Sequence, residues 1–330
     1  MNMDTLFDAV ALRGPVCVGL DSAIDYIPQK ALDEASSPAA ALLAFNKAIV
    51  DATSSACACY KVQIAYYEEH GIEGLRAYAE TLRYVRSLGI PVIADIKRGD
   101  IADTAARYAK AHLDGEFEAD FVTLSPYMGM DSLDPWLEYV GRKGKGLFVL
   151  MRTSNKGMRD FEYRELAEGG WLYDAVGDRI QSLAERYRGA HGYGAVGAVV
   201  GCTEREEATA IRARRHDVFF LIPGYGAQGG AAVDAALLLN RGNGGIVNAS
   251  RSILKAWQQV PGTANPATVG LDQVASAAQS ATVEMQTALR QACAAAAVDT
   301  SAAAARHAAG SAGSAGTGGA ASAADRKTAK

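Results

Sequence analysis

Eight short apolar runs, separated by longer stretches with helical character, are the feature that most constrains the fold of this 330-residue chain. Each run is almost continuously apolar rather than alternating, which is typical of parallel strands covered by helices. The runs are residues 15–21, 58–65, 91–95, 121–125, 146–151, 194–201, 218–223 and 245–249. The intervening helical segments include residues 39–53, 72–88, 101–113, 171–187 and 203–215.

This regular alternation predicts an α/β fold in which eight β/α units form a (β/α)8 TIM barrel. A doubly wound open sheet has similar alternation and is the competing architecture; we favour the barrel because the pattern has eight units. At the start of segment 203–215, Thr-Glu-Arg-Glu has the pattern of a capping box and predicts Thr203 as the N-cap residue.

The C-terminal part of the chain has a different composition. Residues 269–298 are rich in alanine and predict one or two helices beside the barrel. Of residues 301–330, 22 of 30 are Ala, Gly or Ser, and such a segment buries too little apolar surface to offset its ordering entropy. We therefore expect one catalytic domain, residues 1–298, followed by a disordered low-complexity tail, residues 299–330.

Composition also excludes several classes of function. A net charge of −4 argues against a large nucleic-acid-binding surface. The chain has five cysteines, an odd number, and no two of them have the CxxC spacing, which argues against a disulfide framework or a zinc site. The histidines have no metal-ligand spacing, and His112 and His216 are expected to be exposed on helices. With neither an 18-residue apolar run nor a basic N-terminal leader, we expect a soluble cytoplasmic protein without membrane contacts.

Charged residues gather at the ends of the first three predicted strands, where a barrel builds its active site. Asp21 ends the first strand and Lys61 lies in the second. In the third, Asp95 and Lys97 are two residues apart and therefore point to the same side, and Asp100 follows after a glycine. We expect an alternating array of Lys and Asp in one mouth; satisfied surface ion pairs are the alternative explanation.

Two loops after the seventh and eighth strands predict a phosphate site. Residues 223–230 read Pro-Gly-Tyr-Gly-Ala-Gln-Gly-Gly, and their glycines, Gly229 among them, allow backbone N–H groups to approach an anion. Arg251 follows the eighth strand and can bind phosphate oxygens in a bidentate way. In this architecture these two loops commonly bind phosphate, although a glycine-rich loop on its own is equally typical of a tight turn.

A polar segment, residues 153–157, follows the fifth strand. Its hydroxyl and amide side chains, beginning with Thr153 and Ser154, could bind the polar edge of a planar ligand. As an isolated string it also has the composition of a helix-capping loop.

The segment Asp-Ile-Lys-Arg-Gly-Asp-Ile at residues 95–101 resembles the Asp-x-Lys-x-x-Asp-Ile motif of orotidine 5'-phosphate decarboxylases. Residues 19–21, 60–62 and 223–229 fall where that family has its other site segments, and residues 125–129 and 153–155 resemble its longer, bacterial type 2 branch. The resemblance covers about residues 10–260.

The resemblance implies decarboxylation of orotidine 5'-phosphate to uridine 5'-phosphate without a metal or an organic cofactor. Lys97 corresponds to the proton donor to C6 and Asp95 to the group beside the leaving carboxylate. Lys61 and Asp100 are implied to complete the charged array, and Asp21 to bind the ribose hydroxyls. Thr153 and Ser154 are implied to recognise the base. Gln228, with Gly229 beside it, is implied to contact the pyrimidine and the phosphate, and Arg251 to bind the phosphate. Asp100 and Thr104 are expected to reach the partner's site in a homodimer.

Two other functions remain open. Enzymes that act on sugar phosphates share the Asp-x-Lys-x-x-Asp core but use Mg²⁺, and this chain has no clear extra carboxylate at the end of its second strand. A barrel that only senses a nucleotide is the second alternative. The presence of both lysines and both motif aspartates argues against it.

Overall fold

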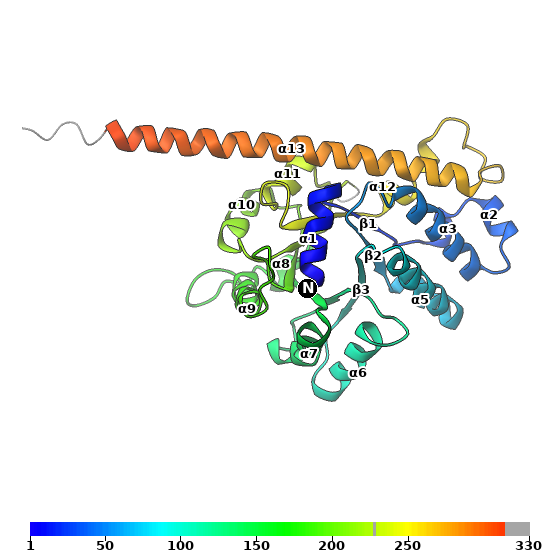
Figure 1. Cartoon of the computed structure of the whole chain (residues 1–330), viewed down its shortest axis with the longest axis horizontal. Coiled ribbons are helices and arrows are strands. Elements are labelled where there is room, and N and C mark those ends of the chain that lie inside the picture. Colours follow the sequence, from blue (N-terminus) through cyan, green and yellow to red (C-terminus); the bar gives the residue numbers. More distant parts are fainter. Residues whose placement is uncertain (227–228, 314–330) are drawn as a thin grey trace, which may run out of the picture.

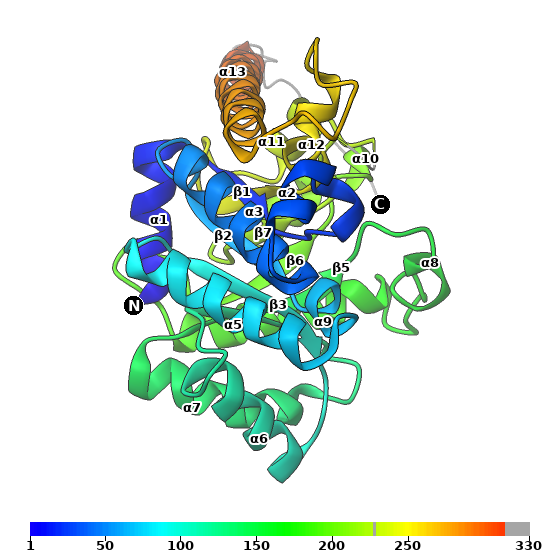
Figure 2. The same cartoon turned by 90° about the vertical axis from the view of Figure 1, so that its right-hand side faces the viewer.

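Eight parallel strands close into a barrel surrounded by helices (Figures 1 and 2). The computed structural model describes residues 1–226 and 229–313, with side chains up to residue 297. The strands are β1 (Val16–Gly19), β2 (Cys59–Gln63), β3 (Val92–Arg98), β4 (Phe121–Leu124), β5 (Gly146–Arg152), β6 (Val196–Val200), β7 (Phe220–Ile222) and β8 (Gly245–Ala249). Each strand pairs in parallel with the next, and β8 pairs with β1. This closure confirms the predicted (β/α)8 barrel and excludes the open sheet.

Helices connect and cover the strands. The α-helices are α1 (Asn2–Arg13), α2 (Gln29–Glu34), α3 (Pro38–Thr53), α4 (Ala65–Glu68), α5 (Gly71–Ser87), α6 (Ala102–Leu113), α7 (Asp134–Lys143), α8 (Met158–Phe161), α9 (Leu172–Arg186), α10 (Arg205–Arg214), α11 (Ala232–Leu237), α12 (Arg251–Leu254) and α13 (Leu271–Gly313). Short 3-10 turns are η1 (Ile24–Tyr26), η2 (Met130–Leu133) and η3 (Ala256–Gln259). A local signal explains the start of α3, because Ser37 accepts a hydrogen bond from the Ala40 amide at 3.1 Å and so caps the helix.

The barrel interior is filled by aromatic and branched side chains. Phe121 and Phe148 pack there with ring centroids 5.5 Å apart. Gly146 makes this possible, because a Cβ atom at that position would lie 2.2 Å from the Phe121 ring. Helix α1, which was not predicted from the sequence, contributes Met3 and Leu6 to the same cluster. The interior is therefore tightly packed, and a barrel of this kind builds its active site at the carboxyl ends of the strands.

Helix α13 lies along one side of the barrel and extends beyond it (Figure 1). It packs against α3 and α11, which confirms the predicted C-terminal helix beside the barrel. The helix continues past residue 298, where the sequence analysis placed the start of the tail, to Gly313. Residues 314–330 lie outside the described part of the chain, so the division into a domain of residues 1–298 and a tail of residues 299–330 stays a prediction.

The predicted capping box of helix α10 is wrong. Its N-cap residue is Glu204 rather than Thr203, and no side chain makes a cap hydrogen bond there. Glu204 instead pairs with Arg159 at 2.9 Å, across 45 residues of sequence. A tertiary contact has replaced the local one that the four-residue pattern predicts.

His112 was expected to be exposed, and that expectation is also wrong. The residue lies in α6 and is only 3% exposed, because the segment that follows the helix places Phe117 against its ring at a centroid distance of 5.5 Å. Burial, with a smaller effect of the Arg98 charge, lowers the pKa of His112 from 6.5 to about 4.

This shift predicts a pH-dependent loss of stability. The folded pKa lies below the unfolded value, so the unfolded chain binds more protons and the free energy of unfolding falls as the pH drops from about 6.5 to about 4. Replacing His112 with Phe removes that contribution and keeps a ring against Phe117. Urea unfolding of both proteins across this pH range measures the difference. Parallel curves for the two proteins would show that His112 does not titrate in this way.

Candidate active site

Four charged side chains meet at the carboxyl ends of β1, β2 and β3. Lys61 Nζ donates to Asp21 Oδ1 and to Asp95 Oδ2, both at 2.9 Å. Lys97 Nζ donates to the other Asp95 oxygen, Oδ1, at 2.7 Å. The structure therefore brings together the alternating lysines and aspartates that the sequence predicted, and they form one hydrogen-bonded array rather than separate surface pairs.

Burial makes this array electrostatically unusual. The side chains of Lys61 and Asp95 are 6% and 7% exposed. Burial alone raises the pKa of Asp95, but the charges of Lys61 and Lys97 outweigh it and hold that pKa well below the usual range. Burial likewise lowers the pKa of Lys61, but Asp21 and Asp95 outweigh it and raise that pKa. Both groups therefore stay charged, and Lys97, which is 46% exposed, is the cation that faces the open mouth.

Strand β3 has an irregularity at the position of Lys97. The pairing of β3 with β4 shifts register between Ala94 and Arg98, and Lys97 has a φ of 44°, a left-handed value that is uncommon for a lysine. The Thr123 hydroxyl oxygen accepts the backbone N–H groups of Ile96 and Lys97, each at 3.0 Å, and donates to Asp95 Oδ1 at 2.8 Å. Thr123 thus stabilises the strained backbone that aims Lys97 at Asp95.

Apolar side chains form the opposite wall of the mouth. A small cavity is lined by the charged residues Lys61, Asp95 and Lys97, by Thr123 and Asn248, and by Leu150, Val199, Leu221 and Pro223. A ligand bound there has charged groups on one side and a low-dielectric surface on the other, which strengthens electrostatic interactions.

Asp21 links this array to the end of β8. Its Oδ2 atom accepts a hydrogen bond from Ser250 Oγ at 2.8 Å, and its Oδ1 atom accepts one from Lys61 Nζ. Asn248 Nδ2 in turn donates to Ser250 Oγ at 3.4 Å. The carboxylate is 21% exposed, so it remains accessible to a ligand at the edge of the mouth.

The loop after β7 adopts a glycine-dependent conformation. Gly224, Gly226 and Gly229 have φ values of 104°, 69° and 95°, which favour glycine, and Gly229 N donates to Gly226 O at 2.8 Å. The loop approaches the start of α12, since a Cβ atom on Gly226 would lie 3.7 Å from Ser252 Oγ. Ala227 and Gln228 lie outside the described residues, so the predicted role of Gln228 has no structural test.

Arg251 is the first residue of α12 and is exposed. Its charge acts on Tyr26 and Tyr66 at the rim of the mouth, because it opposes the rise that burial causes in the pKa of both phenols. Among the described side chains, no carboxylate lies within 4.0 Å of its guanidinium group. The side chain is therefore available to an anionic ligand beside the glycine loop.

Thr153 and Ser154 follow β5 at the same end of the barrel and are both half-buried. Thr153 is held by Glu162, which accepts its backbone N–H at 2.8 Å and its hydroxyl at 2.7 Å. The backbone of Ser154 lies against Gly201 at the end of β6.

Asp100 and Thr104 are outside the array within this chain. Asp100 Oδ1 accepts the backbone N–H of Ile101 at 2.8 Å, before the start of α6. Thr104 is exposed in the first turn of that helix. The single chain thus does not bring these two predicted site residues to the lysines.

Several residues of the site were not predicted from the sequence. Gln63 Nε2 donates to Asp95 Oδ2 at 3.1 Å, Thr123 orients Asp95 and Lys97, and Ser250 orients Asp21. Gln63 could have been found, because it lies two residues after Lys61 and therefore on the same side of the strand. Thr123 and Ser250 carry no comparable local signal.

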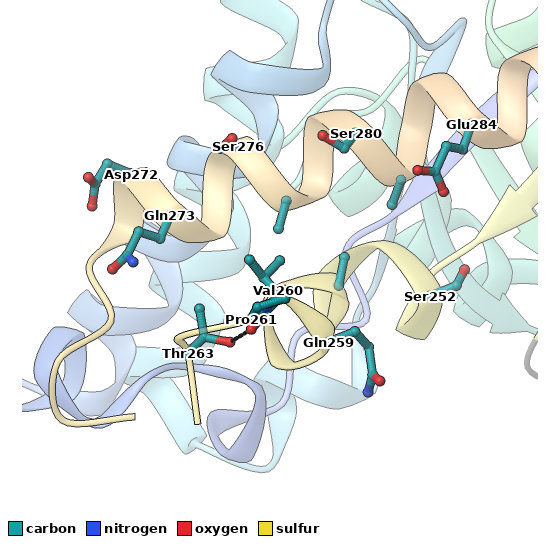
Figure 3. Close-up of a pocket in the computed structure, with 13 residues that line it drawn as sticks. Ser252, Gln259, Val260, Pro261, Thr263, Asp272, Gln273, Ser276, Ser280 and Glu284 are labelled. Carbon is teal, nitrogen blue, oxygen red and sulfur yellow. Dashed lines mark hydrogen bonds between the residues drawn. The ribbon is translucent and has the colours of Figure 1, made fainter. Parts of the chain in front are cut away.

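A larger hollow lies away from this mouth, between α13 and the segment from Ser252 to Thr263 (Figure 3). Its charged lining residues are Asp272 and Glu284 on α13. No cation or nucleophile of the array faces it, so size alone does not identify the site. No group of three or more potential metal-ligating side chains occurs within the described residues. In the same part of the chain, no helix is long and apolar enough to cross a membrane.

Comparisons with known proteins agree with this geometry. Residues 14–261 match the model of the Orotidine 5'-phosphate decarboxylase / HUMPS family. A Clostridium perfringens protein named Orotidine 5'-phosphate decarboxylase is 54% identical over 265 residues, covering 80% of this chain and 92% of the relative. One of the same name from Clostridium kluyveri is 53% identical over 259 residues, covering 78% of this chain and 89% of the relative.

A solved structure extends the similarity to the fold. The Leishmania donovani OMP decarboxylase has a TM-score of 0.66 and 33% sequence identity, covering 87% of this chain and 98% of that one. The matched residues include the whole array at the mouth of the barrel. From the closed barrel, the Lys–Asp array and these matches, we conclude that this chain belongs to the orotidine 5'-phosphate decarboxylase / HUMPS family.

Proposed function

We propose that this carboxy-lyase converts orotidine 5'-phosphate to uridine 5'-phosphate and CO₂ in pyrimidine biosynthesis. The observation that carries the proposal is the buried array in which Lys61 and Lys97 hold opposite oxygens of Asp95. The names of the relatives support the substrate. The reaction uses the side chains of the protein without a metal or an organic cofactor.

Lys97 supplies the proton in the proposed mechanism. When the bond between C6 and the carboxylate breaks, its electron pair stays on C6 and CO₂ leaves. An ammonium group aimed at C6 stabilises this developing negative charge more than it stabilises the substrate, so it lowers the barrier. Lys97 then transfers a proton to C6 and is reprotonated from solvent.

Asp95 lies beside the substrate carboxylate in this arrangement. The two lysines keep it ionised, so its charge opposes the substrate carboxylate before the reaction, and that repulsion disappears as CO₂ leaves. Lys61 fixes the position of Asp95 and of Asp21 at the same time. The array thus combines a repulsive group for the substrate with an attractive one for the carbanion.

The rest of the substrate is bound away from the reacting carbon. Asp21 accepts hydrogen bonds from ribose hydroxyls, and Arg251 binds the phosphate together with Gln228 and the backbone around Gly229. The free energy of these remote contacts offsets the cost of placing the carboxylate next to Asp95.

We further propose a homodimer in which Asp100 and Thr104 complete the partner's array. The supporting observation is an exposed face around the start of α6: Thr104 is exposed and Ile101 is 48% exposed. Tyr127 lies in the loop after the neighbouring strand β4, where Ser125 lies against Gly99, and it is 82% exposed, an unusual value for a large aromatic side chain. A second copy that covers this face buries these groups and brings two more polar side chains to each mouth.

Replacing Arg251 with Ala is expected to weaken binding of the phosphorylated substrate far more than it reduces turnover of the nucleoside orotidine. The reason is that a charge-assisted bidentate contact, which is among the stronger hydrogen-bonded contacts, is lost only for the ligand that carries a phosphate. Steady-state kinetics on both substrates measures the asymmetry. Equal losses on both would remove Arg251 from the phosphate site.

A sugar-phosphate enzyme that uses Mg²⁺ is the second candidate. In this chain the position at the end of β2 is occupied by Gln63, whose amide donates to Asp95 and which has no carboxylate to offer a metal. This contact favours the decarboxylase over the metal-dependent alternative.

The fall in absorbance of orotidine 5'-phosphate, followed with and without EDTA, separates the candidates. We expect equal rates in both conditions. Activity that EDTA abolishes indicates the metal-dependent class, and binding without turnover indicates a nucleotide sensor.

A further inference from the structure

The connection between β3 and α6 carries two predicted site residues on an unusual backbone. Lys97 lies near the end of β3, and Asp100 lies just before α6. Lys97 and Ala102, at the two ends of this turn, have φ values of 44° and 46°, and they are two of the three non-glycine residues with a positive φ in the described part of the chain. Residues keep such conformations only where surrounding contacts hold them, so this turn needs an anchor.

Arg98 makes contacts of this kind on the helix side of the strand. Its Nη2 atom donates to Glu68 Oε1, at the end of α4, at 3.0 Å, and its Nη1 atom donates to Ile96 O at 3.3 Å. The guanidinium carbon lies 5.3 Å from the centre of the Tyr108 ring, which belongs to α6. One side chain thus joins α4, β3 and α6.

The backbone around Arg98 is held as well. Its carbonyl accepts the N–H of Ser125, which follows β4, at 2.8 Å. The next residue, Gly99, lies so close to Ser125 that a Cβ atom on it would be 3.2 Å from the serine Cβ. From the mouth, the Thr123 hydroxyl accepts the Lys97 amide at 3.0 Å. Arg98 from the helix side and Thr123 from the mouth therefore hold the same irregular segment.

The ion pair between Arg98 and Glu68 differs from an ordinary surface pair. Its side chains are 27% and 44% exposed and connect segments 30 residues apart. By contrast, Arg76 and Glu73, 3.1 Å apart within α5, are 72% and 64% exposed. The planar guanidinium of Arg98 serves a carboxylate, a carbonyl and an aromatic ring at once, which the compact ammonium of a lysine does less well.

We propose that Arg98 is a positioning residue, which fixes the turn between β3 and α6 and through it holds the Lys97 ammonium against Asp95. This inference rests on the proposed function, because the geometry that Arg98 maintains is that of the proton donor. Arg98 is not among the described residues that line the mouth cavity, so its effect on the reaction is exerted through Lys97. A displacement of about 1 Å at a reacting group can cost about a hundredfold in rate.

The test separates turnover from binding. For Arg98→Met, which removes the donors but keeps an unbranched side chain beside Tyr108, we measure the single-turnover rate on orotidine 5'-phosphate and the calorimetric dissociation constant of uridine 5'-phosphate. We expect the rate to fall about tenfold or more and the dissociation constant to change less than about threefold, because Asp21 and Arg251 are positioned by other segments. Arg98→Lys keeps a cation for Glu68 and should give an intermediate rate.

Glu68→Ala approaches the same contact from its outer end. The side chain is 44% exposed at the end of a short helix, so the variant should fold even if Arg98→Met does not. We expect its rate to fall about threefold or more, again without a matching loss of affinity. Arg76→Met and Glu73→Ala are the matched controls: they break the surface pair on α5 and should leave both the rate and the affinity unchanged.

An unchanged rate in Glu68→Ala overturns the proposal, whether or not Arg98→Met folds. A purely structural contact gives that result together with a lower melting temperature. Equal losses of rate and affinity also overturn it, since they indicate general damage to the site. A rate in Arg98→Lys no higher than in Arg98→Met has the same consequence.

Failure of the proposed function gives a different result. In that case the unaltered protein does not consume orotidine 5'-phosphate at all. If the unaltered protein consumes it and the Arg98 and Glu68 variants do so at the same rate, only the positioning role of Arg98 is wrong.

Discussion

Lys97→Ala is expected to nearly abolish decarboxylation while the protein stays folded. The lysine is the ammonium that both stabilises the carbanion and protonates it, so its loss removes two contributions to the same barrier. The fold should survive because the Lys97 side chain is 46% exposed and Asp95 keeps its ion pair with Lys61. Single-turnover rates of orotidine 5'-phosphate consumption, together with thermal unfolding, measure both parts of the prediction.

The matched control is Lys110→Ala, which removes an exposed lysine from α6, outside the array. It should leave the rate unchanged. Retention of more than about a tenth of the rate by Lys97→Ala, where each tenfold is about 1.4 kcal/mol of barrier, contradicts the assigned role of Lys97.

Mixing two inactive variants is expected to restore activity if Asp100 serves the partner's site. In a homodimer that combines Lys97→Ala with Asp100→Asn subunits, one site receives both defects and the other receives neither. At equal mixing about half of the dimers are heterodimers with one intact site, so recovery approaches about a quarter of the unaltered activity. Subunit exchange is verified by native mass spectrometry before the rates are compared.

The opposite outcome is equally informative. If exchange is complete and no activity returns, Asp100 acts within its own subunit or the two copies associate through another face. The geometry of the single chain makes this a real test, because Asp100 lies before the start of α6 and bonds the adjacent Ile101 amide rather than any lysine of the array.

Much of the fold follows from patterns that are local in sequence. Apolar runs without alternation indicate buried parallel strands, and eight of them are sufficient for closure, as the pairing of β1 with β8 confirms. The two-residue spacing of Asp95 and Lys97 likewise predicted their common side of β3, because side chains alternate along a strand. Lys61 was predicted to lie close to Asp95 and Lys97 because neighbouring parallel strands end at the same edge of the sheet.

Features that depend on contacts between distant segments were not predictable in this way. The N-cap residue of α10 is Glu204, which pairs with Arg159, and not the predicted Thr203. His112 is buried by the segment that follows its helix, and the sequence of the helix does not determine the path of that segment. Thr123, 28 residues from Asp95, and Glu162, across an insertion from Thr153, orient site residues through side-chain hydrogen bonds. Neither has a periodic or motif signal that marks it.

The most direct test of the central claim is to run the reaction of the unaltered protein in D₂O and identify the product. If the array decarboxylates orotidine 5'-phosphate by protonating C6, the product is uridine 5'-phosphate with one deuterium at C6, formed together with one equivalent of CO₂ and at the same rate in EDTA. Recovery of unchanged orotidine 5'-phosphate, or a requirement for added Mg²⁺, contradicts the account.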